Sequence, residues 1–175
     1  MSNAAQQLVN TDLVDGADAD THEESGEQYL TFDLAGEIYG VDILRVMEIR
    51  GWQGATRVPN QPEFMKGVIN LRGAIVPIFD LRQRFDMGHR AYTEDTVIIV
   101  LKVESTDGTR VMGIIVDAVN DVLNATCQDI RSTPDFGARL DTRFISGLAS
   151  ARDNMIVLLN VDSLLKLESV MSEGS

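Results

Sequence analysis

The sequence contains few of the residues from which metal sites and disulfides are built. Its 175 residues include one cysteine and two histidines. The single cysteine, Cys127, excludes an internal disulfide and a tetrahedral thiolate zinc site. No histidine or lysine stands beside Cys127 to activate its thiol, so we expect this residue to be unreactive.

Motifs typical of catalysis are also missing. Neither His22 nor His89 has a partner at the spacing of a catalytic triad or a metal site, and we interpret both as surface residues. Glycine-rich nucleotide-binding motifs are absent. Four scattered acids leave acid-base chemistry open in principle, although we expect them to be solvent-facing or capping residues: Glu48, Asp80, Asp117 and Asp121. We predict no enzyme activity, no catalytic residues, no metal and no cofactor.

Basic residues are missing from the first part of the chain. Residues 1–28 contain seven acids and no lysine or arginine, and the whole chain has a net charge of −12. Such a chain lacks the basic surface that binds phosphate backbones or anionic membranes. It has no secretion signal and no run near the roughly 18 apolar residues of a membrane span. We expect a cytoplasmic protein with no nucleic-acid partner and no direct membrane contact.

The character of the sequence changes near residue 28. Residues 1–27 are small, polar and acidic without a periodic apolar face, which is typical of a disordered leader. From Tyr29 onward, apolar and polar residues alternate as in a half-buried strand. We therefore expect an acidic leader at 1–27, one folded domain at 28–168 and a C-terminal tail at 169–175.

The folded part repeats one pattern. The segment YGVDILRVMEI at 39–49 matches MGIIVDAVNDV at 112–122. Four pairs of positions share the same offset: Gly40 with Gly113, Val46 with Val119, Glu48 with Asp121, and Ile49 with Val122. A repeated pattern predicts a duplicated architecture. We expect two similar lobes, with either one packed core or two small cores that share an interface.

Turn residues divide the folded part into β-hairpins. They are expected at 28–41, at 67–79 around Asn70-Leu71-Arg72-Gly73, at 97–119 around Asp107-Gly108, and at 145–160 around Asp153-Asn154. Asp80 and Gln83 have the spacing of a capping box, which predicts a short helix. The segment 162–165 occupies the corresponding place in the second half. These patterns indicate an all-β protein.

Some apolar residues have two interpretations. Met47, Met65 and Met112 lie within apolar runs, where methionine either fills gaps in a core or contacts a partner. Trp52 follows a turn, where a large aromatic residue either anchors an interface or covers the end of a barrel.

Five segments together resemble the CheW chemotaxis coupling proteins: QYLTFDL, YGVDILRVMEI, VPNQP, GVINLRGAIVPIFDLR and MGIIVDAVNDV. The resemblance runs from about Gln28 to Leu167. Its most specific part is the run from Gly67 to Gly73, followed by Pro77 and by Asp80-Leu81-Arg82. The resemblance implies an all-β fold with short helices, made of two five-stranded SH3-like β-barrel subdomains that are intertwined within residues 28–168.

The resemblance also implies a function. Proteins of this family are non-enzymatic adaptors that bridge transmembrane chemoreceptors and the histidine kinase CheA. We therefore expect a protein, monomeric in isolation, that binds the regulatory domain of CheA and the cytoplasmic tips of methyl-accepting chemoreceptors. Two alternatives stay open: a CheW-like scaffold of another kinase-linked pathway, in motility or development, and a small hydrolase that uses grouped acids.

The resemblance implies two sets of contact residues. The kinase set lies on the first barrel and consists of Glu48, Ile49 and Gly67. The receptor set lies in the groove between the barrels and consists of Val46, Arg72, Val97, Gly113, Val119 and Val122. The residues themselves allow simpler interpretations, because the valines fit a core, Arg72 fits a solvated or locally paired side chain, and the glycines fit turns or bulges. Equivalent edges of two barrels would form an apolar groove suited to a helix hairpin.

Overall fold

The computed structural model describes residues 26–126, 128–132 and 142–166. In the first half of the chain the strands are β1 (Glu27–Leu34), β2 (Glu37–Asp42), β3 (Val46–Gly51), β4 (Met65–Leu71) and β5 (Ala74–Asp80). In the second half they are β6 (Val97–Ser105), β7 (Gly108–Val116), β8 (Ala118–Ala125), β9 (Ile130–Arg131), β10 (Ile145–Ala151) and β11 (Asn154–Leu159). The helical turns are η2 (Ile43–Arg45), α3 (Leu81–Arg84), η3 (Thr142–Phe144) and α4 (Val161–Leu164).

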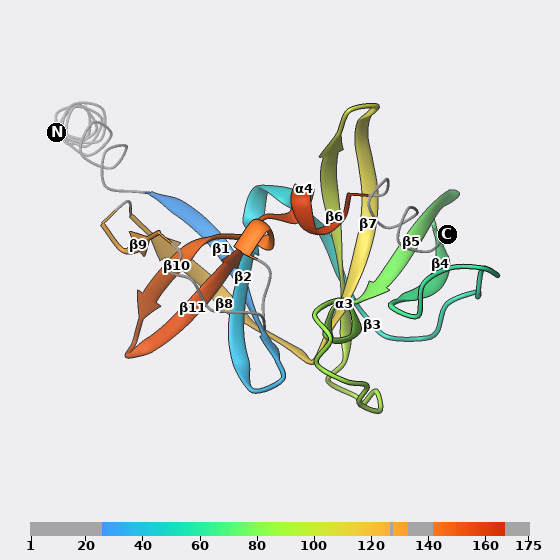
Figure 1. Ribbon diagram of the computed structural model, residues 1–175, viewed down its shortest axis with the longest axis horizontal. Helices are drawn as coiled ribbons and strands as arrows, with labels where there is room; N and C mark the ends of the chain where they lie inside the picture. Colours follow the sequence, from blue (N-terminus) through green and yellow to red (C-terminus); the bar gives the residue numbers. More distant parts are fainter. Residues whose placement is uncertain (1–25, 127, 133–141, 167–175) are drawn as a thin grey trace, which may run out of the picture.

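The strands form two curled sheets that lie side by side (Figure 1). One sheet has the order β8-β1-β2-β11-β10-β9, and we call it the terminal lobe because it contains the first and the last strand of the described chain. The other has the order β3-β6-β7-β5-β4, and we call it the central lobe. This arrangement confirms the predicted all-β fold with two barrel-like subdomains and short helices. One detail differs, since the two-residue strand β9 gives the terminal lobe a sixth strand where five were expected.

The two lobes do not coincide with the two repeated halves of the sequence. After β2 the chain leaves the terminal lobe and adds β3 to the edge of the central lobe, where β3 pairs with β6. After β7 it returns and adds β8 to the edge of the terminal lobe, where β8 pairs with β1. Each lobe therefore contains strands from both halves. The predicted kinase residues Glu48, Ile49 and Gly67 lie on β3 and β4, and both strands belong to the central lobe. This lobe also contains strands from the second half of the chain.

Strand register shows the internal duplication in detail. In the central lobe, Ile78 lies between Gly67 on one neighbouring strand and Gly113 on the other. In the terminal lobe, Leu158 lies between Gly147 and Gly40 in the same way. The pairing to Gly113 and the pairing to Gly40 are both parallel. The repeated pattern in the sequence thus corresponds to two lobes with the same strand pairing.

The largest group of buried side chains lies at the junction of the lobes. It joins Phe32 and Tyr39 of the terminal lobe to Phe79 and Ile99 of the central lobe. Two smaller clusters flank it: one within the central lobe, around Val76, Ile78 and Ile98, and one within the terminal lobe, around Ala149, Ile156 and Leu158. Because the largest cluster is shared, neither lobe buries its apolar face alone.

The four predicted hairpins are present, and α3 begins where the capping box predicts. Asp80 accepts a hydrogen bond from the backbone N–H of Gln83 and caps α3. The second helix differs from the prediction because its N-cap is Asn160, whose side chain accepts from the N–H of Ser163, and Asp162 lies inside α4. The apolar run expected as one strand over 111–119 is broken at Asp117, where the chain passes from β7 into β8.

Candidate partner-binding surface

Strand β3 presents an apolar outer row on the edge of the central lobe. Its residues alternate between half-buried and exposed, and the exposed ones include Met47 and Ile49, the latter with 43% of its surface accessible. Val46 and Glu48 are half-buried on the opposite side of the strand. Val46 packs against the junction core. The alternation therefore places Val46, a predicted receptor residue, against the core, and it leaves the side chain of Ile49 accessible to a partner.

The turn between β4 and β5 holds Arg72 next to β3. Arg72 and Gly73 both have positive φ, at 51° and 92°, and the side-chain oxygen of Asn70 accepts a hydrogen bond from the Gly73 N–H at 2.8 Å. This geometry is that of a tight hairpin turn. The Arg72 side chain is 75% exposed and donates to Glu48 Oε1 at 3.0 Å. The predicted kinase set and the predicted receptor set therefore meet in one ion pair.

The glycines of the two predicted sets are buried packing positions. Gly67 has φ of 138°, and a Cβ there would lie 2.2 Å from the carbonyl oxygen of Thr56. Thr56 and Val68 exchange two backbone hydrogen bonds at 2.8 and 2.9 Å, which close the loop after β3 onto β4. A Cβ on Gly113 would lie 2.6 Å from Ile78 Cδ1. Neither glycine presents a side chain to a partner, so each shapes the lobe from within.

Strand β8 presents the corresponding edge on the terminal lobe. Val119 is half-buried against the junction core, and Val122 is 45% exposed. Asp121 accepts a hydrogen bond on its backbone oxygen from the Thr31 hydroxyl at 2.7 Å. Its carboxylate lies 3.8 Å from the Arg152 guanidinium, at the tip of the β10–β11 hairpin. The repeat thus gives both lobes an edge strand with an acid near a hairpin arginine.

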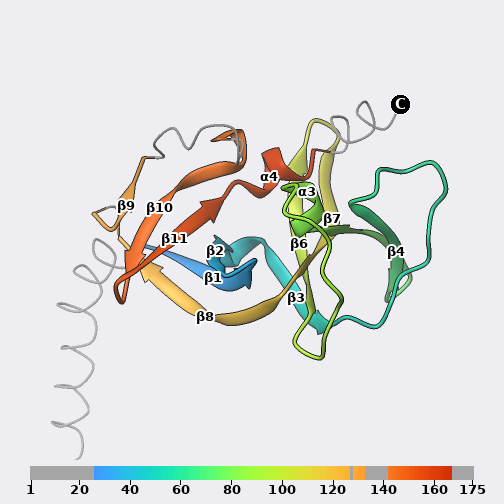
Figure 2. The ribbon, with the colours of Figure 1, turned by 60° about the horizontal axis from the view of Figure 1, so that its bottom comes forward.

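The structure brings three of the six predicted receptor residues to the junction core. Val46, Val97 and Val119 all pack against the shared junction core. Val97 pairs with Gly51 of β3 and Val116 of β7, so it lies inside the central sheet. Strands β3 and β8 lie on one side of the junction, whereas α3 and α4 lie on the other (Figure 2).

Exposed apolar residues beyond the predicted sets were missed. Leu44 in η2 is 81% exposed, and Ile75 and Met155 are exposed on the hairpins of the two lobes. Met47 was assigned to core or contact from its apolar surroundings, and the structure exposes it, whereas Met112 is buried. The alternation of β3 was the available signal for Met47. No local pattern separates Leu44 from a buried residue.

The structure also locates two other residues that the sequence analysis named, Trp52 and His89. Trp52 is half-buried, packs against the inner cluster of the central lobe and makes an edge contact with Tyr92 at 4.8 Å between ring centroids. This position agrees with a cover over the end of the barrel. His89 is exposed, as predicted. Cys127, His22 and most of the expected leader lie outside the described residues, and β1 begins at Glu27, within the range expected for the leader.

The described residues offer little for chemistry. Among them, no three His, Cys, Asp or Glu side chains are placed to hold a metal ion. No helix in this part of the chain is long and apolar enough to cross a membrane. Burial, followed by a hydrogen bond to Asp80, raises the pKa of Tyr92 above its ordinary value. The phenol donates to the buried carboxylate at 2.6 Å, an arrangement that stabilises the fold.

Two curled sheets with one junction core and apolar edge strands place the chain among the two-barrel β proteins. The family model described as "CheW-like domain" matches residues 28–169. The chain is 46% identical to the chemotaxis protein CheW of Klebsiella aerogenes over 148 residues, which covers 85% of this chain and 87% of that protein. It is 37% identical to the chemotaxis protein CheW of Rhizobium meliloti over 168 residues, covering 96% and 97%.

A solved structure agrees with these relatives. The scaffolding protein TtCheW from Thermoanaerobacter tengcongensis superposes with a TM-score of 0.74 at 35% identity, over 81% of this chain and 93% of that chain. The protein therefore belongs to the CheW-like domain family.

Proposed function

We propose that this protein is a chemotaxis adaptor that bridges chemoreceptors and the histidine kinase CheA. It binds the cytoplasmic tips of methyl-accepting chemoreceptors and the regulatory domain of the kinase, so that receptor state controls kinase activity. The adaptor is non-enzymatic and acts in the cytoplasm as a monomer that assembles with its partners. Its relatives named for chemotaxis and its structural neighbour named as a scaffolding protein support this role.

The observation that carries the proposal is the surface formed by β3 and the β4–β5 turn. Ile49 and Met47 expose apolar area on an edge strand, and Arg72 pairs with Glu48 of the same strand while most of its side chain stays in solvent. Buried apolar area contributes roughly 25 cal/mol per Å² to association, and arginine is common among the residues that dominate interfaces. The ion pair to Glu48 holds Arg72 in place before a partner arrives, which reduces the entropy lost on binding.

The two partners use different parts of this surface. We assign the kinase contact to Glu48 and Ile49, with Gly67 shaping the wall behind them, and all three lie in the central lobe. We assign the receptor contact to the junction, where Val46 and Arg72 of the central lobe face the same partner as Val119 and Val122 of the terminal lobe. Val97 and Gly113 support this groove from inside the central sheet. A receptor helix hairpin would bridge the lobes in the helix-in-groove mode.

Replacing Arg72 tests this assignment. Arg72→Ala should weaken binding to a receptor-tip fragment by about 2 kcal/mol, which is roughly a thirtyfold loss of affinity, because a central interface arginine is removed. Isothermal titration calorimetry measures the affinity, and circular dichroism checks that the fold is intact. Because Arg72 has positive φ, Arg72→Asn is a second variant that tolerates the backbone better.

The matched control is Arg110→Ala. Arg110 also lies on a hairpin and pairs with an acid, Asp107, at 3.2 Å. It lies near the turn of the β6–β7 hairpin, at the opposite end from Val97, and belongs to neither predicted set, so its removal should leave the affinity unchanged. Unaltered receptor binding by both Arg72 variants would show that the groove assignment is wrong.

A further inference from the structure

Each crossing of the chain between the lobes is held by a short helix that follows a strand of the lobe being left. At the first crossing, Arg45 ends η2 and directly precedes β3. Its guanidinium donates two hydrogen bonds to Asp162 of α4, both at 2.8 Å. Asp162 also accepts from the backbone N–H of Glu104 in β6 at 2.8 Å. Since α4 follows β11 of the terminal lobe, Asp162 ties that lobe to the central one.

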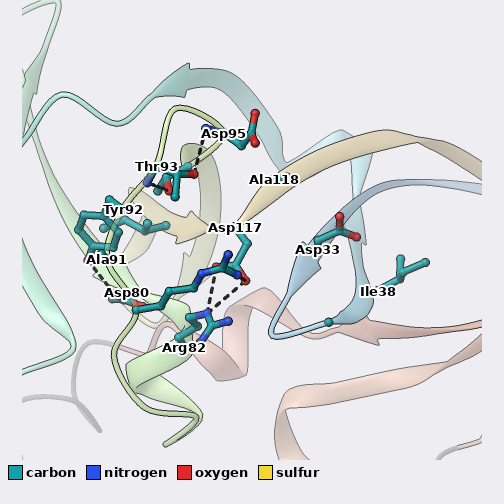
Figure 3. A pocket seen from close by; sticks show the side chains of 14 residues that line it. Asp33, Ile38, Asp80, Arg82, Ala91, Tyr92, Thr93, Asp95, Asp117 and Ala118 are labelled. Atoms are coloured by element: carbon teal, nitrogen blue, oxygen red, sulfur yellow. Dashed lines mark hydrogen bonds and ion pairs between the residues drawn. The ribbon is translucent and has the colours of Figure 1, made fainter.

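At the second crossing, Asp117 is the single residue between β7 and β8. Its carboxylate accepts from Arg82 Nε of α3 at 3.0 and 3.1 Å and from the Ala35 N–H at 2.9 Å. Its own N–H donates to the Asp33 carbonyl at 3.1 Å. Figure 3 shows Arg82 directed at Asp117 in a cavity of about 420 Å³ between the lobes, which Asp33 also lines. Asp117 therefore joins the β1–β2 turn of the terminal lobe to α3, which follows β5 of the central lobe.

We call these two sets of contacts clamps; they lie at corresponding crossings of the chain but have opposite polarity. Arg82 is the second residue of α3, and Asp162 is the second residue of α4. At the first crossing the cation is on the crossing segment and the anion on the helix, whereas at the second crossing the signs are exchanged. The hydrogen bond that Arg45 donates to Asp162 raises the pKa of its guanidinium above the ordinary value.

Both clamps are partly shielded from water. The Arg82 and Asp117 side chains are only 15% and 23% exposed, and Arg45 and Asp162 are similarly half-buried. Ion pairs of this kind are screened less than surface pairs, and removing Arg82 leaves Asp117 with only the more distant cation of Arg90, at 3.9 Å. The two clamps therefore fix the position of the backbone at the start of β3 and at the start of β8.

We propose that Asp117 is a positioning residue for the receptor groove, whereas Arg45 precedes β3, which carries contacts to both partners. Val46 follows Arg45 directly, and Val119 lies two residues after Asp117, so the clamps fix the starts of the two strands that carry the receptor contact. The kinase contact lies within the central lobe and does not depend on the placement of β8. This inference rests on the proposed function and adds a role for residues outside both contact sets.

The test compares the binding of two partner fragments to the full chain. Asp117→Asn and Arg82→Gln should each weaken binding to a receptor-tip fragment by roughly tenfold, whereas affinity for a kinase regulatory-domain fragment should change by less than about twofold. Asp117→Glu keeps the charge and both acceptor oxygens, so it should retain most receptor binding. Asp107→Asn is the matched control, because it breaks the exposed pair with Arg110 on the β6–β7 hairpin and should alter neither affinity.

Each outcome has a distinct meaning. Selective loss of receptor binding, rescued by Asp117→Glu, supports the positioning role. Equal loss of both affinities would show that the clamp is a general stabilising contact, and it would overturn the proposal. Variants that bind both fragments with the affinity of the parent protein would also overturn it. A parent chain that binds neither fragment would overturn the proposed function, and this inference with it.

Discussion

Asp80 connects three segments of the central lobe through one residue. Its N–H donates to the Phe64 carbonyl at 2.7 Å, and its two carboxylate oxygens accept from the Gln83 N–H at 3.3 Å and the Tyr92 hydroxyl at 2.6 Å. The residue is 2% exposed. A buried carboxylate is tolerated when its oxygens are hydrogen-bonded. The sequence predicted the helix cap but not the phenol, because Tyr92 lies in a loop without a periodic pattern.

Tyr92→Phe tests this contact through the pH dependence of stability. Burial and Asp80 raise the pKa of Tyr92 in the folded protein above the ordinary value of 10.0. A group with a raised pKa contributes stability that is complete below its unfolded pKa and is lost as pH rises toward the folded value. The parent protein should therefore lose stability above about pH 10. Tyr92→Phe should cost about 1–3 kcal/mol at pH 7, because Asp80 loses a donor, and should show a smaller alkaline loss.

Urea unfolding followed by circular dichroism at pH 7 and at increasing alkaline pH measures both effects. Tyr39 also has a raised pKa, mainly from burial, so some alkaline dependence should persist in the variant. Identical pH profiles for the parent and the variant would contradict the assigned role of Tyr92.

Hairpins and caps are the elements that the sequence predicts best, because their signals are local. Asp107-Gly108 and Asn70 to Gly73 mark turns at the expected places. The chain crossing at Asp117 was missed because β-branched residues lie on both sides of it, and only the tertiary pairing of β8 with β1 shows that the strand changes sheet. The start of α4 was predicted two residues too late, at Asp162, because the true cap, Asn160, directly follows the apolar run of β11.

The β10–β11 turn offers a prediction about backbone conformation. Arg152 and Asp153 both have positive φ, at 48° and 65°, which non-glycine residues adopt at a cost. Asn-Gly is the sequence that tight turns of this geometry favour. Replacing both residues with Asn-Gly should raise the free energy of unfolding by about 0.5–1 kcal/mol.

Thermal and urea unfolding measure this change. Arg152 is highly exposed and lies 3.8 Å from Asp121, so the lost ion pair contributes little. The same exchange at Thr106-Asp107, whose φ values are not positive, is the matched control and should give no gain. Equal stabilisation at both turns would show that backbone conformation is not the cause.

At the scale of the whole molecule, the repeat predicted the two lobes but not how the chain is shared between them. The apolar pattern of each strand is the same whether a half folds on itself or exchanges strands with the other half. The exchange is set by tertiary contacts at η2 and Asp117, which no local signal records. The same limit applies to the candidate surface, because burial decides that Gly113 packs inside while Leu44 faces solvent.

Cutting the chain between the halves tests the exchange directly. Four strand pairings join the halves: β1 with β8, β2 with β11, β3 with β6, and β5 with β7. A fragment of residues 1–89 leaves β3 without its partner, and a fragment of residues 90–175 does the same to β8. Each fragment also exposes its side of the junction core, so neither buries enough apolar surface to offset chain entropy.

We expect each fragment alone to lack cooperative unfolding and dispersed amide resonances, and a one-to-one mixture to recover both. The cut falls between the exposed residues His89 and Arg90, in the loop between α3 and β6, so it interrupts no strand. Stability of the mixture should depend on concentration, because association replaces a covalent connection. If either fragment folded cooperatively by itself, that half would be an independent unit and the shared core would not be required for folding.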